Sequence, residues 1–184
     1  MYAILLAVLL PLVMSASDPT KVCMPDKLEF DSFNLDTEEG AHISVDFTQN
    51  MMVLAYPNRT EVEDFDDLKI YTIYNTGKCE FINLPSDAVF PQCLPANAVF
   101  LGEASFGFGP HHLDDEAWLI PFAGGTLQLI YSKQFNQPQY VFVSKYTDAS
   151  GKHESTVYPN PTLGISKPEV FQIPGNCSPV KSCQ

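Results

Sequence analysis

The chain is short of basic residues and has only one long apolar run, and these two shortages exclude several classes of protein. Lysine and arginine number 10 against 22 aspartate and glutamate residues, which gives a net charge of −12. A surface this acidic repels the phosphates of nucleic acids and of anionic lipids. We therefore expect no nucleic-acid binding, and no window after the first apolar run is long enough to span a membrane.

The apolar run covers residues 2–14, carries no charge and is followed by the small residues Ser15, Ala16 and Ser17. This pattern predicts a secretory signal peptide over residues 1–17, which is removed from the mature protein. A membrane anchor would need about 20 apolar residues. The sequence thus predicts a secreted, extracellular protein in which residues 18–184 form a single domain.

Motifs for catalysis are also missing. In the glycine-rich stretch 102–109, Glu103 stands two positions before Ser105, where a nucleophile elbow requires glycine. The stretch also lacks the Lys-Ser/Thr ending of a phosphate-binding loop. Cys93 with His111 or His112 can be imagined as a thiol nucleophile, but in an oxidising compartment a structural cysteine is the better interpretation. We expect no enzymatic activity and no organic cofactor.

Helical periodicity is absent from every window of a dozen residues, and a period of two dominates instead. Short alternating runs separated by turn residues predict an all-β fold of the sandwich or open-barrel type. The predicted strands cover residues 42–47, 51–56, 68–74, 79–82, 99–106, 117–120, 126–131, 140–146 and 154–158.

Two acidic runs are the candidates for binding a metal. Residues 111–116 read His-His-Leu-Asp-Asp-Glu, but adjacent histidines on an extended chain point to opposite faces, so a solvated loop is predicted there. Residues 61–67 lack the glycine and the final glutamate of an EF-hand loop. Calcium is therefore a weak possibility only. Its candidate ligands are Asp64, Asp66, Asp67, Asp114, Asp115 and Glu116.

Five cysteines are present, none of them in a Cys-x-x-Cys pair, which excludes zinc-ribbon and thioredoxin-like sites on spacing. In a secreted chain most of them should be bridged. The odd count leaves at least one thiol free or bonded to another chain, so a homodimer is one possible assembly. Asn58-Arg59-Thr60 is an N-glycosylation sequon in a turn-like context.

The order of features along the second half of the chain carries a family resemblance. Asn-Thr-Gly-Lys precedes Cys79, Phe-Leu-Gly ends at Gly102, and Trp118 is the only tryptophan. Gly-Ile-x-x-Pro-x-Val-Phe then ends at Phe171, and Pro-x-x-Cys ends at Cys177. This ordered set, over residues 23–177, resembles the ependymin family, most closely its invertebrate ependymin-related members.

The resemblance implies a fold of two curved antiparallel sheets with a deep apolar pocket on one face, similar to bacterial lipoprotein-carrier folds. It also implies a disulfide between Cys79 and Cys177, which would fasten the proline-rich segment before Cys177. Vertebrate members pair six cysteines, and here Cys23 and Cys183 lack their usual partners. We therefore expect Cys93 to bond either Cys23 or Cys183. Fish members are calcium-binding glycoproteins with a sequon in the stretch that matches Asn58.

Two functions follow as expectations. The first is a secreted glycoprotein that binds a hydrophobic small molecule or lipid, such as a fatty acid, in a β-sheet pocket. The second is an acidic, calcium-binding protein of cell–matrix adhesion or of a secreted or calcified extracellular matrix. The chain has 13 Phe and 8 Tyr, which either fill a core or line a cavity. The candidate lining residues are Phe106, Trp118, Leu129, Tyr131, Tyr140 and Phe142.

Overall fold

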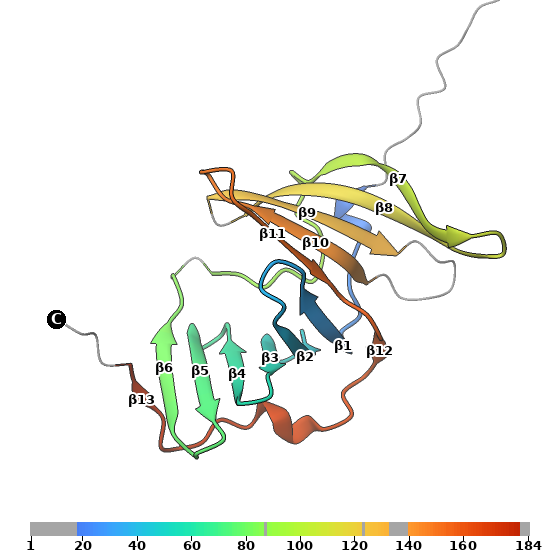
Figure 1. Cartoon of the computed structure of the whole chain (residues 1–184). Helices are drawn as coiled ribbons and strands as arrows, with labels where there is room; N and C mark the ends of the chain where they lie inside the picture. The colour runs from blue at the N-terminus through green and yellow to red at the C-terminus, as the bar shows by residue number, and fades with distance from the viewer. Residues whose placement is uncertain (1–17, 87, 123, 133–139, 181–184) are drawn as a thin grey trace, which may run out of the picture.

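The computed structural model describes residues 18–86, 88–122, 124–132 and 140–180, and the side chains of residues 104, 106–108 and 111 lie outside that description. The predicted signal peptide and Cys183 also lie outside the described residues. The fold is all-β, as predicted from the alternating pattern (Figure 1). The strands are β1 (Lys27–Asn34), β2 (Gly40–Asp46), β3 (Met51–Ala55), β4 (Arg59–Asp64), β5 (Lys69–Tyr74), β6 (Cys79–Asn83), β7 (Val99–Phe108), β8 (His111–Phe122), β9 (Gly125–Ser132), β10 (Val141–Thr147), β11 (His153–Val157), β12 (Thr162–Leu163) and β13 (Ser178–Pro179).

Two short 3-10 helices, η1 (Pro19–Lys21) and η2 (Pro168–Phe171), complete the secondary structure of the described residues. Within the part of the chain that the structure describes, no helix has the length and apolar character needed to cross a membrane.

The strands form one continuous, open sheet in the order β13-β6-β5-β4-β3-β2-β1-β11-β10-β9-β8-β7, with β12 beside β1. Figure 1 shows two halves, β1–β6 and β7–β11, set at an angle to each other. They are joined at β1 and β11, where only Phe33–Val157 and Asn34–Thr156 pair. The two sheets expected from the resemblance are thus one hydrogen-bonded sheet with a sharp bend at this short junction.

The register places Ile43 opposite Leu54 in one half and Trp118 opposite Leu129 in the other. Because side chains alternate across a strand, these residues share one face, which we call the inner face. The segment 84–98 links β6 to β7, and its described residues 88–98 run between the two halves (Figure 1). Phe90 of this segment stacks on the rings of Phe47 and Phe65, with centroids 4.7 and 4.9 Å apart.

The N-terminal segment, residues 18–26, covers the inner face of the β7–β11 half together with the end of the segment 84–98. Leu94 and Val22 are each 3 % exposed and pack against Trp118. Backbone hydrogen bonds and a Cys23–Cys93 disulfide hold the two covering segments together. Much of the inner face is thus covered by these two segments of the same chain.

The opposite, outer face of the β1–β6 half is covered by the proline-rich C-terminal segment. Phe171 is buried there with Val53 and Val62, which are 1 % and 0 % exposed. The disulfide Cys79–Cys177 ties the end of this segment to β6. This is the bond implied by the family resemblance, and Cys23–Cys93 is one of the two alternatives left open for Cys93.

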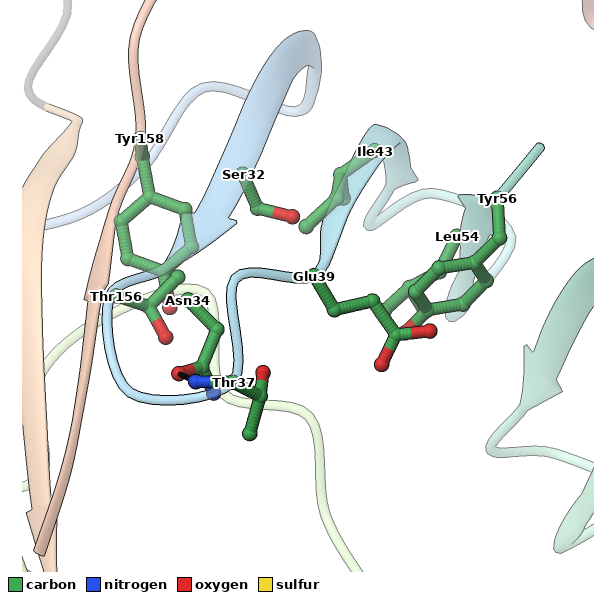
Figure 2. Close-up of a pocket in the computed structure, with 9 residues that line it drawn as sticks. All are labelled: Ser32, Asn34, Thr37, Glu39, Ile43, Leu54, Tyr56, Thr156 and Tyr158. Carbon is green, nitrogen blue, oxygen red and sulfur yellow. Dashed lines mark hydrogen bonds between the residues drawn. The ribbon is translucent and has the colours of Figure 1, made fainter.

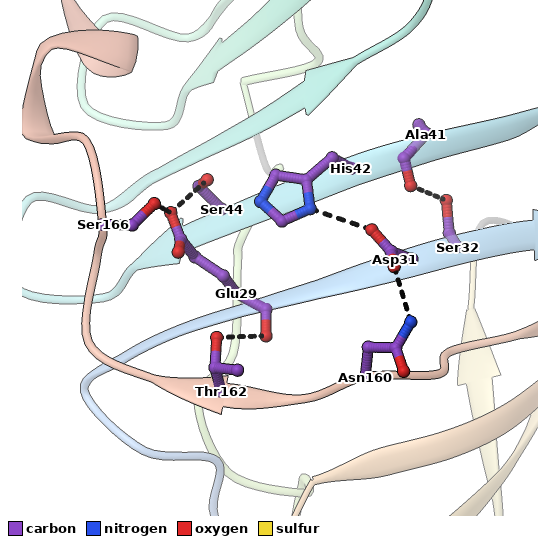
Figure 3. Close-up of polar contacts among 9 residues, drawn as sticks. All are labelled: Glu29, Asp31, Ser32, Ala41, His42, Ser44, Asn160, Thr162 and Ser166. Atoms are coloured by element: carbon purple, nitrogen blue, oxygen red, sulfur yellow. Dashed lines mark hydrogen bonds and ion pairs between the residues drawn. The ribbon is translucent and has the colours of Figure 1, made fainter.

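Strand β1 was not predicted from the sequence, because its acidic residues resemble those of an exposed loop. Glu29 is only 5 % exposed, and its carboxylate accepts hydrogen bonds from the hydroxyls of Ser44 and Ser166, both at 3.1 Å (Figure 3). Hydrogen bonds from Asn160 and His42 lower the pKa of Asp31. Both acidic residues of β1 thus anchor neighbouring segments on the outer face.

Candidate functional site

A cavity of about 190 Å³ opens on the inner face beside the bend in the sheet. Figure 2 shows Thr156 and Tyr158 on one side of it and Leu54 and Tyr56 on the other. The apolar lining is formed by Ile43, Leu54 and the rings of Tyr56 and Tyr158. The polar lining is formed by Ser32, Asn34, Thr37, Glu39 and Thr156.

The bend explains why a space remains at this place. β1 and β11 pair over two residues only, so the inner-face side chains beyond the junction diverge. Tyr158 follows β11 and fills part of the gap, with its ring edge-to-face against Phe30 at 5.5 Å. Its hydroxyl lies 2.8 Å from the Ser144 Oγ, and burial raises the pKa of Tyr158. The wall on this side is therefore a neutral ring with a hydrogen-bonded hydroxyl.

The opposite rim carries charge. Arg59 donates from Nε to Glu61 at 2.7 Å and from Nη2 to Glu39 at 3.1 Å. Its guanidinium also lies over the Tyr56 ring, 4.0 Å from the centroid. Burial raises the pKa of Tyr56, and so do the negative charges of Glu61 and Glu39. Two carboxylates therefore surround one cation, and the rim is net negative.

Another acidic group lies on the same face, further along β4. Glu63 pairs across the strands with Met52 and Ile70. Burial, together with the nearby charge of Glu61, raises the pKa of Glu63 to about 7. Its carboxylate has no hydrogen bond or ion pair within the described residues. Glu63 is thus an acidic residue whose ionisation is disfavoured by the fold.

Three of the residues predicted to line a pocket lie elsewhere on the inner face. Trp118, Leu129 and Tyr131 are 1 %, 7 % and 4 % exposed and pack beneath Val22 and Leu94. Tyr140 packs on the cluster around Ile43, and Phe142 is a half-buried residue at a bulge in β10. None of these five lines the cavity described above, and the side chain of Phe106 lies outside the described part.

The first group of calcium candidates stabilises the turn after β4. The Asp64 Oδ1 accepts from the backbone N–H groups of residues 66 and 67. Asp66 accepts from Asn50, while Asp67 accepts from Lys69 at 2.7 Å and from the Tyr71 hydroxyl at 2.8 Å. These carboxylates are therefore spread over separate local contacts.

The second group lies in β8, where a solvated loop was predicted. That prediction was wrong, because β8 begins at His111 and pairs with both β7 and β9. Asp115 and Glu116 are only 1 % and 4 % exposed. Burial and the charge of Asp114 raise the pKa of Asp115, while Glu116 accepts from the Trp118 indole at 3.3 Å. Among the described residues, no three potential metal ligands gather in one place.

Asn58 of the predicted sequon lies in the turn between β3 and β4 and is exposed. Its position leaves room for a glycan at the protein surface.

Sequence reasoning missed the cavity residues because most of them are polar. Ser32 and Asn34 belong to β1. The alternation of Leu28 and Phe30 with acidic residues was the sequence pattern that could have indicated this strand. Thr37 and Glu39 lie in a turn and reach the cavity only because β1 and β2 form a hairpin.

No protein-family model and no curated protein matches the chain. A solved structure of an uncharacterized conserved protein from Thermus thermophilus is similar, with a TM-score of 0.56 and 9 % identity. The match covers 84 % of this chain and 89 % of that one. At this identity the likeness concerns the fold alone.

Proposed function

We propose that the chain is a secreted, non-enzymatic, ependymin-related protein that binds an apolar molecule at the bend of its sheet. The observation that carries the proposal is the cavity between Leu54 and Tyr158, which is lined by apolar side chains and rings together with five polar residues. The two disulfides suit an oxidising compartment. The bond of Cys93 to Cys23 supports a structural role for this cysteine.

The size of the cavity limits the ligand. A volume of about 190 Å³ is below the roughly 300–1,000 Å³ of pockets for drug-sized molecules. It exceeds the roughly 150 Å³ of an engineered cavity that accommodates benzene. The proposed occupant is therefore a single ring or a short alkyl segment. A longer lipid would place one end in the cavity and leave its remainder outside.

The proposal is tested with Nile red, an uncharged dye whose emission responds to apolar surroundings. Its fused rings are too large for the cavity, so its diethylamino end is the part expected to enter, with the remainder outside. Leu54→Trp should fill the cavity and weaken dye binding at least about tenfold. Excluding two methylene equivalents costs about 1.6 kcal/mol, which is more than a factor of ten. Ile82→Trp is the matched control, because Ile82 is on the inner face of β6, is 50 % exposed and does not line the cavity.

Fluorescence titration should give saturable binding to the wild type and to the Ile82→Trp control, within about a factor of two of each other. Equal affinity of Leu54→Trp and wild type would place the dye elsewhere and contradict the proposal. Absence of saturable binding, together with calcium-dependent self-association, would instead favour the matrix function expected from the acidic composition.

A further inference from the structure

The polar groups of the cavity influence which ligands can bind there, an inference that rests on the function proposed above. Glu39 is the one residue with a formal charge among the described residues that line the cavity, and this charge is negative. Arg59 is the cation at the rim, but Glu39 and Glu61 already bind it on two sides. A ligand anion at this rim would therefore meet a surplus of negative charge.

The charges of the site lie at the protein surface, where the Glu39 side chain is 49 % exposed. Two charges near a protein surface interact several times more strongly than in bulk solvent. Arg59 is only 26 % exposed, so it has little freedom to leave its partners and reach an incoming anion. A carboxylate would also lose part of its hydration beside the apolar side chains of Ile43 and Leu54, which line the cavity.

The remaining polar groups suit an uncharged partner. The Ser32 hydroxyl makes a long bond of 3.3 Å to the carbonyl of Ala41, and the Tyr158 hydroxyl shares its bond with Ser144. The Asn34 Oδ1 accepts from two backbone N–H groups of the following turn. Hydroxyls can rotate to donate or to accept. They can therefore exchange a hydrogen bond with a hydroxyl, amide or ester without any change in charge.

We propose that the site selects apolar ligands with an uncharged polar end, such as an alcohol, amide or ester, and discriminates against carboxylates. Free fatty-acid anions are thus disfavoured ligands, and Glu39 is the residue that excludes them.

The test compares hexan-1-ol with hexanoate at about pH 8, where the acid is ionised, by displacement of Nile red. An alcohol is easier to desolvate than a carboxylate in any apolar site. A preference of the wild type for hexan-1-ol over hexanoate is therefore not sufficient evidence for a role of Glu39. The decisive measurement is the effect of Glu39→Gln. It should raise hexanoate affinity about five- to tenfold by removing a negative charge and freeing Arg59 from one partner. The affinity for hexan-1-ol should stay within about a factor of two.

Glu169→Gln is the control, because it changes the net charge equally at an exposed position in η2, on the outer face of the sheet. It should alter neither affinity. Added salt should raise the affinity of the wild type for hexanoate and leave that for hexan-1-ol nearly unchanged, a readout that needs no variant.

Two results would overturn the inference and still leave an apolar site in place. One is an unchanged affinity of Glu39→Gln for hexanoate, and the other is a wild type that binds hexanoate as tightly as hexan-1-ol. Failure of both ligands to displace the dye would overturn the proposed function as well.

Discussion

Replacing Cys79 and Cys177 together with alanine is expected to lower the free energy of unfolding by about 4–5 kcal/mol. The two residues are separated by 98 positions, and closing a loop of this length restricts the unfolded chain by about that amount in the chain-entropy model. The folded state is affected too, because the segment before Cys177 covers Val53 and Val62. Chemical denaturation of the wild type and the double variant measures the loss.

Hydrogen exchange gives the location of the effect. Without the bond, backbone protection should fall first in the C-terminal segment and in β6, to which β13 is paired. The matched comparison is the double replacement of Cys23 and Cys93, which should loosen the segments that cover Trp118 instead. A loss below about 1 kcal/mol for Cys79→Ala with Cys177→Ala would show that the bond contributes little to holding the outer face.

Glu63→Gln is expected to stabilise the protein in neutral and alkaline solution and to have little effect in acid. The fold raises the pKa of Glu63 from 4.5 to about 7, so the folded protein holds this proton more tightly than the unfolded chain does. The contribution of Glu63 to stability is fully present below its pKa in the unfolded chain. It is lost progressively as the pH rises through its pKa in the folded protein. Glutamine removes the ionisation, and the gain above pH 7 should be about 2 kcal/mol after allowance for partial exposure.

Denaturation of both proteins between about pH 4 and pH 8 measures this difference. Asp46 also makes stability depend on pH, but it does so equally in the wild type and in Glu63→Gln, and at lower pH. Burial would raise the pKa of Asp46, but hydrogen bonds from Lys27, Thr48 and Gln49 lower it from 3.8 to about 2. Its stabilisation is therefore lost only as the pH falls through that range. A gain that is the same at every pH would contradict the assignment of the effect to ionisation of Glu63.

The sequence predicted the strands whose alternation is apolar on one face, such as β2, β3 and β5. It missed β4, whose residues 61–64 belong to an acidic run considered for calcium binding. It also missed β1 and the start of β8, because Glu29, Asp115 and Glu116 are charged in sequence but buried in the fold. Their burial depends on partners distant in the chain, such as Ser166 for Glu29. No local pattern contains that information.

The candidate site was less predictable than the fold. Alternation assigns residues to faces, and it correctly places Trp118 and Leu129 together. It does not reveal that Val22 and Leu94 fill the space above them. The cavity lies instead where β1 and β11 part after two paired residues, a consequence of long-range strand order.

The location of a bound ligand tests the central claim most directly. An uncharged photoactivatable alkyl diazirine, added to the disulfide-bonded protein and activated by light, marks the residues it contacts. Peptide mapping should find saturable labelling around Leu54 and Tyr56 and around Thr156 and Tyr158, suppressed by excess hexan-1-ol. Labelling confined to other surfaces, or labelling that excess hexan-1-ol does not suppress, would contradict a ligand site at the bend of the sheet.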